Sequence, residues 1–190
     1  RHLGHSRVKN LFKFVSAKMN TVFTVESALE FDACFHLEYS HDIHSYEAQP
    51  EGFYYAFEGR DCPYTPDFRV VDQQGNASLI EVKPSDKVAD PDFLQRFPFK
   101  QQRAIELSCP LKLITERQIR IDPILGNLKL LHRYSGFQSF TPLHMQLLGL
   151  VKDLGRVSLA RLSGSTGAPP EDVLATALSL IARGLIHSDL

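Results

Sequence analysis

The chain has 190 residues, of which 43% are hydrophobic and 23% are charged, and its formal net charge is −1. This length allows one domain of ordinary size plus a small one, and the near-neutral charge argues against a protein that binds nucleic acid over its whole surface. Because no apolar run is long enough to cross a bilayer and no secretory leader precedes the first element, we expect no membrane segment.

The charge is unevenly distributed along the chain. Residues 1–25 carry five Lys or Arg and no acid, whereas residues 26–92 carry fifteen Asp or Glu against four basic residues. Residues 93–134 return to eight basic against three acidic residues. An acidic centre between basic segments suits a site that holds divalent cations beside a phosphate backbone. Scattered solvated charge is the alternative interpretation.

The cysteines give no indication of a metal site. Cys34, Cys62 and Cys109 are odd in number and lack the spacing of metal ligands. They predict free thiols in a reducing compartment, and we expect a cytoplasmic protein.

In chain order, the first expected element is a basic arm over residues 1–24, and a helix follows over residues 25–38 with Ser27 near its start. Short β-branched or aromatic runs bounded by Pro, Gly and Asp predict strands. These runs are residues 43–50, 52–59, 65–72 and 77–84, the last two joined as a hairpin. Residues 92–107 predict a helix that starts late or kinks at Pro98, and residues 111–115 predict a buried strand. The order indicates a mixed α/β fold.

The composition changes after Tyr134. Residues 135–141 are typical of a linker, and helical patterns then cover residues 143–154, 159–165 and 170–183, followed by a short strand from Leu185. Three helices and a strand predict a winged-helix domain over residues 142–190, after a first domain over residues 1–134. Because the third helix begins with Glu171 and Asp172, which repel phosphates, we expect this domain to bind protein.

Strand alternation places three chemically active side chains on one face of the hairpin. Asp67 lies on one strand, and Glu81 and Lys83 lie on the next. Two carboxylates, with the carbonyl of Val82 between them, are hard ligands that suit Mg²⁺ or Mn²⁺. A lysine beside such a metal can hold the attacking water. The alternative is a charged, solvent-exposed hairpin.

Five short motifs occur in a fixed order along the first part of the chain. They are Ser16 to Asn20, Glu26 to Glu30, Gln49-Pro50, Tyr64 to Phe68, and Ile80 to Pro84. This series resembles the TnsA family, the endonuclease subunits of heteromeric bacterial transposases of the cut-and-paste, target-selecting kind. The motifs cover roughly residues 7–84, and residues 109–119 resemble the strand that closes the family's catalytic domain.

The resemblance implies a restriction-endonuclease-like fold and a set of active-site residues. By position these are the helical acid Glu30, the strand acid Asp67, and the Glu-x-Lys pair Glu81 and Lys83. Glu26 is the rival for the helical acid. A later acid of the family falls at Lys100, which is a departure from the pattern. Gln49 is either a supporting residue behind the site or a turn residue before Pro50.

By implication, the reaction is metal-dependent hydrolysis of double-stranded DNA at the 5′ ends of a transposon. A DDE-type transposase, TnsB, cuts the 3′ ends, and an ATPase regulator, TnsC, contacts the C-terminal domain. The candidate DNA contacts lie in the basic arm: Arg7, Lys9, Lys13, Ser16 and Lys18. A solvated N-terminal segment is the alternative for the arm. For the whole chain, the alternatives are a non-catalytic DNA-bound adaptor and a stand-alone restriction or repair nuclease.

Overall fold

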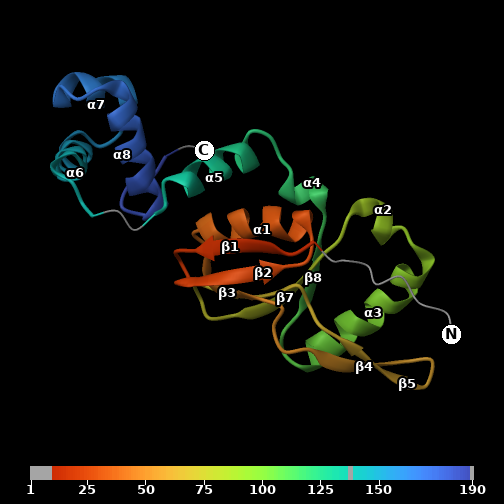
Figure 1. The fold of residues 1–190 in the computed structure, drawn as a ribbon. Helices are drawn as coiled ribbons and strands as arrows, with labels where there is room; N and C mark the ends of the chain where they lie inside the picture. The colour runs from red at the N-terminus through yellow and green to blue at the C-terminus, as the bar shows by residue number, and fades with distance from the viewer. Residues whose placement is uncertain (1–9, 137–138, 189–190) are drawn as a thin grey trace. The chain divides into compact units, whose positions relative to one another are not determined.

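The computed structural model describes residues 10–136 and 139–188, which form two compact units dividing between Ile121 and Asp122 (Figure 1). The sequence places this boundary later, after Tyr134. The difference arises because helix α5 (Ile124–Arg133) packs against the last helix of the chain and so belongs to the second unit. Arg7 and Lys9 of the expected basic arm lie outside the described residues. Within the described ranges, no helix is long and apolar enough to cross a membrane.

A four-stranded mixed sheet is the centre of the first unit. Its order is β3-β6-β7-β8, with β8 parallel to β7 and the other neighbours antiparallel. The strands are β3 (Ile43–Ala48), β6 (Phe68–Asp72), β7 (Ala77–Val82) and β8 (Leu111–Ile114). A parallel pair needs a crossover connection, which α2 (Ser85–Val88) and α3 (Pro91–Glu106) provide here. The expected mixed α/β fold and the β6–β7 hairpin are confirmed, and this sheet fits a restriction-endonuclease-like domain.

Helices α1 (Ala28–Tyr39) and α3 cover the sheet from opposite sides (Figure 1). Ser27 caps α1 as expected, since its side chain accepts a hydrogen bond from the Glu30 N–H at 3.1 Å. Helix α3 begins at Pro91, where the Asp90 side chain caps it. The expected late start at Pro98 is therefore wrong, and Pro98 lies exposed inside the helix.

Two further hairpins accompany the sheet. Strands β1 (Phe12–Ser16) and β2 (Thr21–Val25) pair where the sequence suggested a basic arm. The side chain of Phe14 is fully buried and meets Phe35 of α1 edge to face, with ring centroids 5.1 Å apart. Along β1, the buried Phe14 and Ser16 alternate with the exposed Lys13 and Val15. The segment is therefore a packed hairpin.

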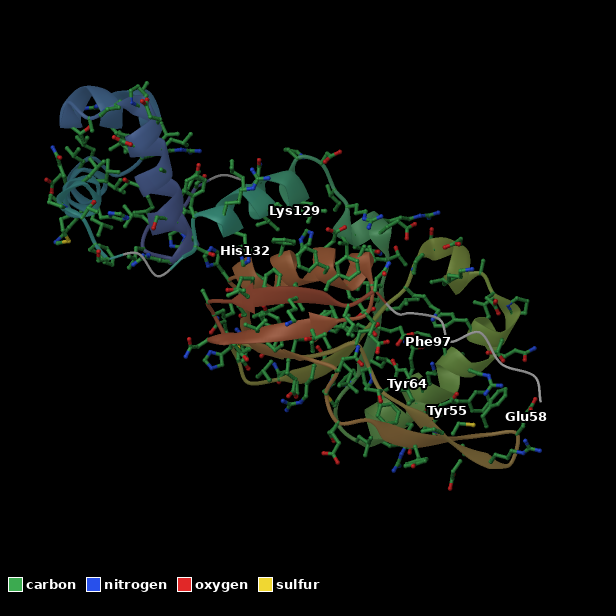
Figure 2. All side chains as sticks on the ribbon, viewed as in Figure 1. Tyr55, Glu58, Tyr64, Phe97, Lys129 and His132 are labelled. Carbon is green, nitrogen blue, oxygen red and sulfur yellow. The ribbon has the colours of Figure 1, made fainter. Side chains whose placement is uncertain are left out.

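The second hairpin, β4 (Phe53–Phe57) and β5 (Arg60–Tyr64), lies against α3. The sequence indicated β4 but not β5, whose Asp61 and Pro63 weaken the strand pattern. Figure 2 labels Tyr55, Tyr64 and Phe97, which belong to the core between this hairpin, α3 and the sheet. This core positions the face of β7 that carries Glu81.

The second unit is helical throughout its described part. Its helices are α5, α6 (Pro142–Leu154), α7 (Leu159–Thr166) and α8 (Pro170–Ala182). The last three agree closely with the expected helices, and their core contains Leu147, Leu162, Val173 and Leu180. Residues 185–188 form no strand, so the described part of this unit lacks the strand expected of a winged helix.

Candidate active site

Asp67 and Glu81 face each other across the β6–β7 ladder. The ladder pairs Phe68 with Ile80, and the Asp67 N–H donates to the Ile80 carbonyl at 3.0 Å. Because side chains alternate along a strand, the next pair places Asp67 and Glu81 on the side of the sheet that also carries Leu79. Leu79 packs in the core with α3 and the β4–β5 hairpin. The two carboxylates therefore lie at the border of that core.

The Asp67 carboxyl group has an unusual affinity for a proton. Burial, and secondly the negative charge of Glu81, raise its pKa to about 8. The Val82 N–H, which donates to Oδ2 at 2.7 Å, offsets only part of this rise. The half-buried Asp67 and the buried Glu81 therefore oppose each other's negative charge, a condition that a bound cation relieves.

Glu81 is held at both carboxylate oxygens. The Tyr64 hydroxyl donates to Oε2 at 2.6 Å, and Lys83 Nζ lies 3.4 Å from Oε1. Burial and the charge of Glu81 raise the pKa of Tyr64, so this hydroxyl stays protonated and remains a donor. Tyr64 begins the Tyr64-to-Phe68 motif, but the sequence did not indicate its contact with Glu81.

Two lysines lie beside the carboxylates. Lys83 Nζ is 4.7 Å from the centroid of the Phe93 ring, so its ammonium lies between an acid and an aromatic face. Lys100 of α3 lies with Nζ 4.2 Å from the Tyr64 ring centroid. Burial is the main cause that lowers the pKa of Lys100, and the charges of Lys83 and Arg96 act in the same direction. The negative charges of Glu81 and Asp67 offset part of this decrease. The position that departs from the family pattern therefore brings a second cation to the site.

Glu30 uses its carboxylate at the start of α1. Oε1 accepts the Ser27 hydroxyl at 2.7 Å, and Oε2 accepts the Glu26 N–H at 3.0 Å. Glu30 is buried and its charge contributes to the raised pKa of Asp67, but its carboxylate folds back on its own helix. Glu26, the rival acid, is exposed and precedes the helix.

Among the described residues, no three His, Cys, Asp or Glu side chains converge as a ready-made metal cluster. The donor set that fits a metal is the Asp67–Glu81 pair, because its oxygens are hard ligands and the repulsion between its two charges favours a divalent cation. Mg²⁺ commonly binds through one or two carboxylates and retains several waters, so two carboxylates are sufficient.

Two further predicted site residues are Gln49, which supports the site through its backbone, and Lys13, which stays a predicted DNA contact. Gln49 has φ 50° and an exposed side chain, and its N–H donates to the Asp67 carbonyl at 2.8 Å, so its backbone holds the Asp67 strand end. Lys13 is exposed on β1.

Ser16 and Lys18 correct the expectation of a DNA-binding arm. The fully buried Ser16 donates to the Glu38 carboxylate at 2.6 Å. Lys18 Nζ donates at 2.8 to 3.1 Å to three carbonyls around the end of α1, those of Leu37, Ser40 and Ile43. Their polar groups hold the hairpin to the helix, which favours a structural role for both residues over a DNA contact.

A mixed sheet with an Asp on one strand and a Glu-x-Lys on the next defines the class of restriction-endonuclease-like nuclease domains. Residues 40–116 match the family model described as TnsA-like endonuclease N terminal. These residues are therefore similar to a TnsA-like endonuclease domain, and the resemblance to the TnsA family is confirmed for this span. The matched span contains Asp67, Glu81 and Lys83 but excludes α1 with Glu30. No curated protein matches the chain.

Proposed function

We propose that the chain is a metal-dependent DNA endonuclease subunit of a cut-and-paste transposase, with Asp67, Glu81 and Lys83 at its catalytic centre. The observation that supports this most is the Asp67–Glu81 pair inside the matched span of residues 40–116, where burial, and then the charge of Glu81, raise the pKa of Asp67 to about 8. Lys83 lies beside Glu81, but the like charges of the two carboxylates still oppose each other, and a bound metal cation would offset this repulsion.

In the proposed reaction, Asp67 and Glu81 hold Mg²⁺ or Mn²⁺. When bound, the metal polarises the phosphate and lowers the pKa of a coordinated water. Tyr64 fixes one oxygen of Glu81, which keeps the carboxylate in one orientation. Lys83 orients the attacking water and offsets charge on the phosphate. The products are a 5′-phosphate and a 3′-hydroxyl.

The cuts fall at the 5′ ends of the transposon, while a TnsB-type transposase cuts the 3′ ends. The second unit is the proposed winged-helix-like, protein-binding domain. We assign it the role of binding a TnsC-type ATPase regulator. Two observations support a protein partner. Glu171 and Asp172 are exposed in the first turn of α8, where they repel phosphates, and an apolar hollow of about 750 Å³ lies among α6, α7 and α8.

Cleavage of a transposon-end duplex in Mg²⁺, with the transposase and ATPase present, tests this function. We compare wild type with Asp67→Asn and Lys83→Ala, and we use Asp61→Asn, an exposed position on β5, as the matched control. The 5′ cuts should fall at least about 100-fold in the two site variants while 3′ cuts continue, since removal of a catalytic electrostatic group costs about 10²–10³ in rate. The control should cut normally.

Two outcomes favour the alternatives. If both site variants cut the 5′ ends like wild type, the hairpin is only a charged surface and the chain is a DNA-bound adaptor. If the purified chain alone cuts DNA without its partners, it is a stand-alone nuclease that uses the same chemistry.

A further inference from the structure

A hollow of about 290 Å³ lies where α2 and α3 meet, beside the carboxylate pair. Four cations line it, and we call it the cationic hollow: Lys83, Lys87, Arg96 and Lys100. Its volume is at the lower end of the roughly 300–1,000 Å³ typical of ligand pockets, which suits a small anion or one nucleotide unit.

The acids of the cationic hollow are already used within the fold. Asp92 accepts a hydrogen bond from Arg96 Nε at 2.6 Å, and Asp90 caps α3 by accepting the Asp92 N–H at 2.9 Å. Lys83 forms an ion pair with Glu81, its Nζ lying 3.4 Å from Oε1. Lys87 and Lys100 make no ion pair with any residue that the structure describes. The hollow therefore keeps two cations that no described carboxylate holds in an ion pair, although the charges of Glu81 and Asp67 act on Lys100.

Aromatic rings hold three of these cations in place. Besides Lys83 over Phe93, the Arg96 guanidinium lies 4.5 Å from the Phe57 ring centroid and the Lys100 ammonium 4.2 Å from that of Tyr64. A ring face orients a cation and leaves its donors available, because it accepts no directed hydrogen bond. The half-buried Lys100 thus lies ready for an anion from outside the chain.

We propose that the cationic hollow is a phosphate-binding subsite that seats the DNA backbone beside Asp67 and Glu81, with Lys87 and Lys100 as its principal phosphate contacts. This inference rests on the proposed endonuclease function and names the surface that receives the substrate. It replaces the β1–β2 hairpin in that role, where the polar groups of Ser16 and Lys18 serve the fold.

DNA binding by the full chain tests the subsite. We measure the fluorescence anisotropy of a labelled duplex over a series of salt concentrations, with Ca²⁺ replacing Mg²⁺ to prevent cutting. The variants are Lys87→Gln and Lys100→Gln. The matched control is Lys112→Gln, an exposed lysine that β8 directs away from the Glu81 face, because it pairs with Ile80. Lys87 is exposed, so its variant stays informative if Lys100→Gln disturbs folding.

We expect each hollow variant to weaken binding about 3- to 10-fold and to lower the salt slope by about 1, the amount that one lost phosphate contact removes. The Lys112→Gln control should match wild type. The proposal is overturned if both hollow variants bind with the affinity and salt slope of the control, or if the wild-type chain binds no duplex at low salt.

A second variant separates this proposal from the proposed function. Asp67→Asn should still bind duplex DNA through the hollow, since Lys87 and Lys100 remain, but should not cut it. If Asp67→Asn cuts normally while the hollow variants bind weakly, the endonuclease assignment fails and the subsite stands. If Asp67→Asn is inactive while the hollow variants bind like wild type, the subsite fails and the endonuclease stands.

Discussion

Tyr64 controls one oxygen of Glu81 through a single short hydrogen bond. We expect Tyr64→Phe to lower the rate of 5′-end cleavage about 10- to 100-fold, the usual effect of losing a group that orients a metal ligand. The free energy of unfolding should fall by only about 1 kcal/mol, since the ring and its packing remain. Cleavage assays with urea unfolding check both values, and Tyr54→Phe on the exposed side of β4 is the control. Equal activity of the two variants would show that Tyr64 has no role in orienting Glu81.

The raised pKa of Asp67 predicts how stability depends on pH. Between the ordinary pKa of 3.8 and the folded value of about 8, the folded chain keeps a proton that the unfolded chain has released. In the absence of metal, the free energy of unfolding therefore falls as the pH rises through this window. An amide in place of the Asp67 carboxyl group has no proton to release, so Asp67→Asn should gain about 1–3 kcal/mol over wild type between pH 5 and pH 8.

Tyrosine fluorescence during urea unfolding can measure this difference. The chain has no Trp and six Tyr, of which all except Tyr134 lie in the first unit, so the signal reports mainly on the unit that contains Asp67. A stability difference between the two proteins that is the same at pH 5 and at pH 8 would contradict the assigned environment of Asp67.

Among the elements, the start of α1 combines an observed capping role of Glu30 with the active-site role that the resemblance implies for it. Glu30→Gln keeps one of the two acceptor oxygens at the start of α1, and Gln also serves at the third helical position. We expect this variant to unfold within about 0.5 kcal/mol of wild type but to cut at least about tenfold more slowly. Ser27→Ala should show the reverse, a loss of about 1 kcal/mol with little change in cutting. Normal cutting by Glu30→Gln would leave Glu30 as a helix cap alone.

The β1–β2 hairpin depends on Lys18 for its attachment to α1. Lys18→Met removes three hydrogen bonds to carbonyls while retaining an unbranched apolar stem. We expect it to lower the free energy of unfolding by about 1–3 kcal/mol, because buried carbonyls lose a charged donor. Lys13→Gln, on the exposed side of the same hairpin, should unfold like wild type. Weaker DNA binding by Lys18→Met with unchanged stability would instead restore Lys18 as a DNA contact.

The regular elements of the chain were predictable where local pattern and packing agree. The β6–β7 hairpin, α1 with its Ser27 cap and the last three helices follow directly from periodicity and capping residues. The β1–β2 hairpin was not predicted as a structural element, because the five basic residues and the lack of acids in residues 1–25 gave the segment the composition of an arm. Its strands become visible only when Phe14 and Val25 meet the core.

The candidate site was likewise predictable only where the local sequence pattern determines it. Alternation places Asp67 and Glu81 on one face without any structure, since the two residues lie on adjacent strands. Tyr64 and Lys100 were missed because they reach the site from β5 and α3 through tertiary packing, which no sequence spacing records. The capping contacts of Glu30 depend on the position of a side chain, which the motif could not supply.

In the whole molecule, the two units have separate proposed roles. The proposed nuclease centre lies within the first unit, and the matched family span of residues 40–116 lies there as well. The proposed partner-binding domain lies in the second unit. The boundary predicted after Tyr134 separates α5 from the last three helices. In the structure, α5 belongs to the same unit as those helices. A variant of the carboxylate pair should therefore leave the proposed contact between the second unit and an ATPase partner unchanged.

The central claim is that Asp67 and Glu81 form a divalent-cation site. Isothermal titration of Mn²⁺ into the wild-type chain, Asp67→Asn and the exposed control Asp61→Asn tests it most directly. We predict saturable binding by wild type and by Asp61→Asn, and binding at least about 10-fold weaker by Asp67→Asn, because one of two charged ligands is lost. Equal Mn²⁺ binding by Asp67→Asn and wild type, or no binding by wild type, would contradict the account.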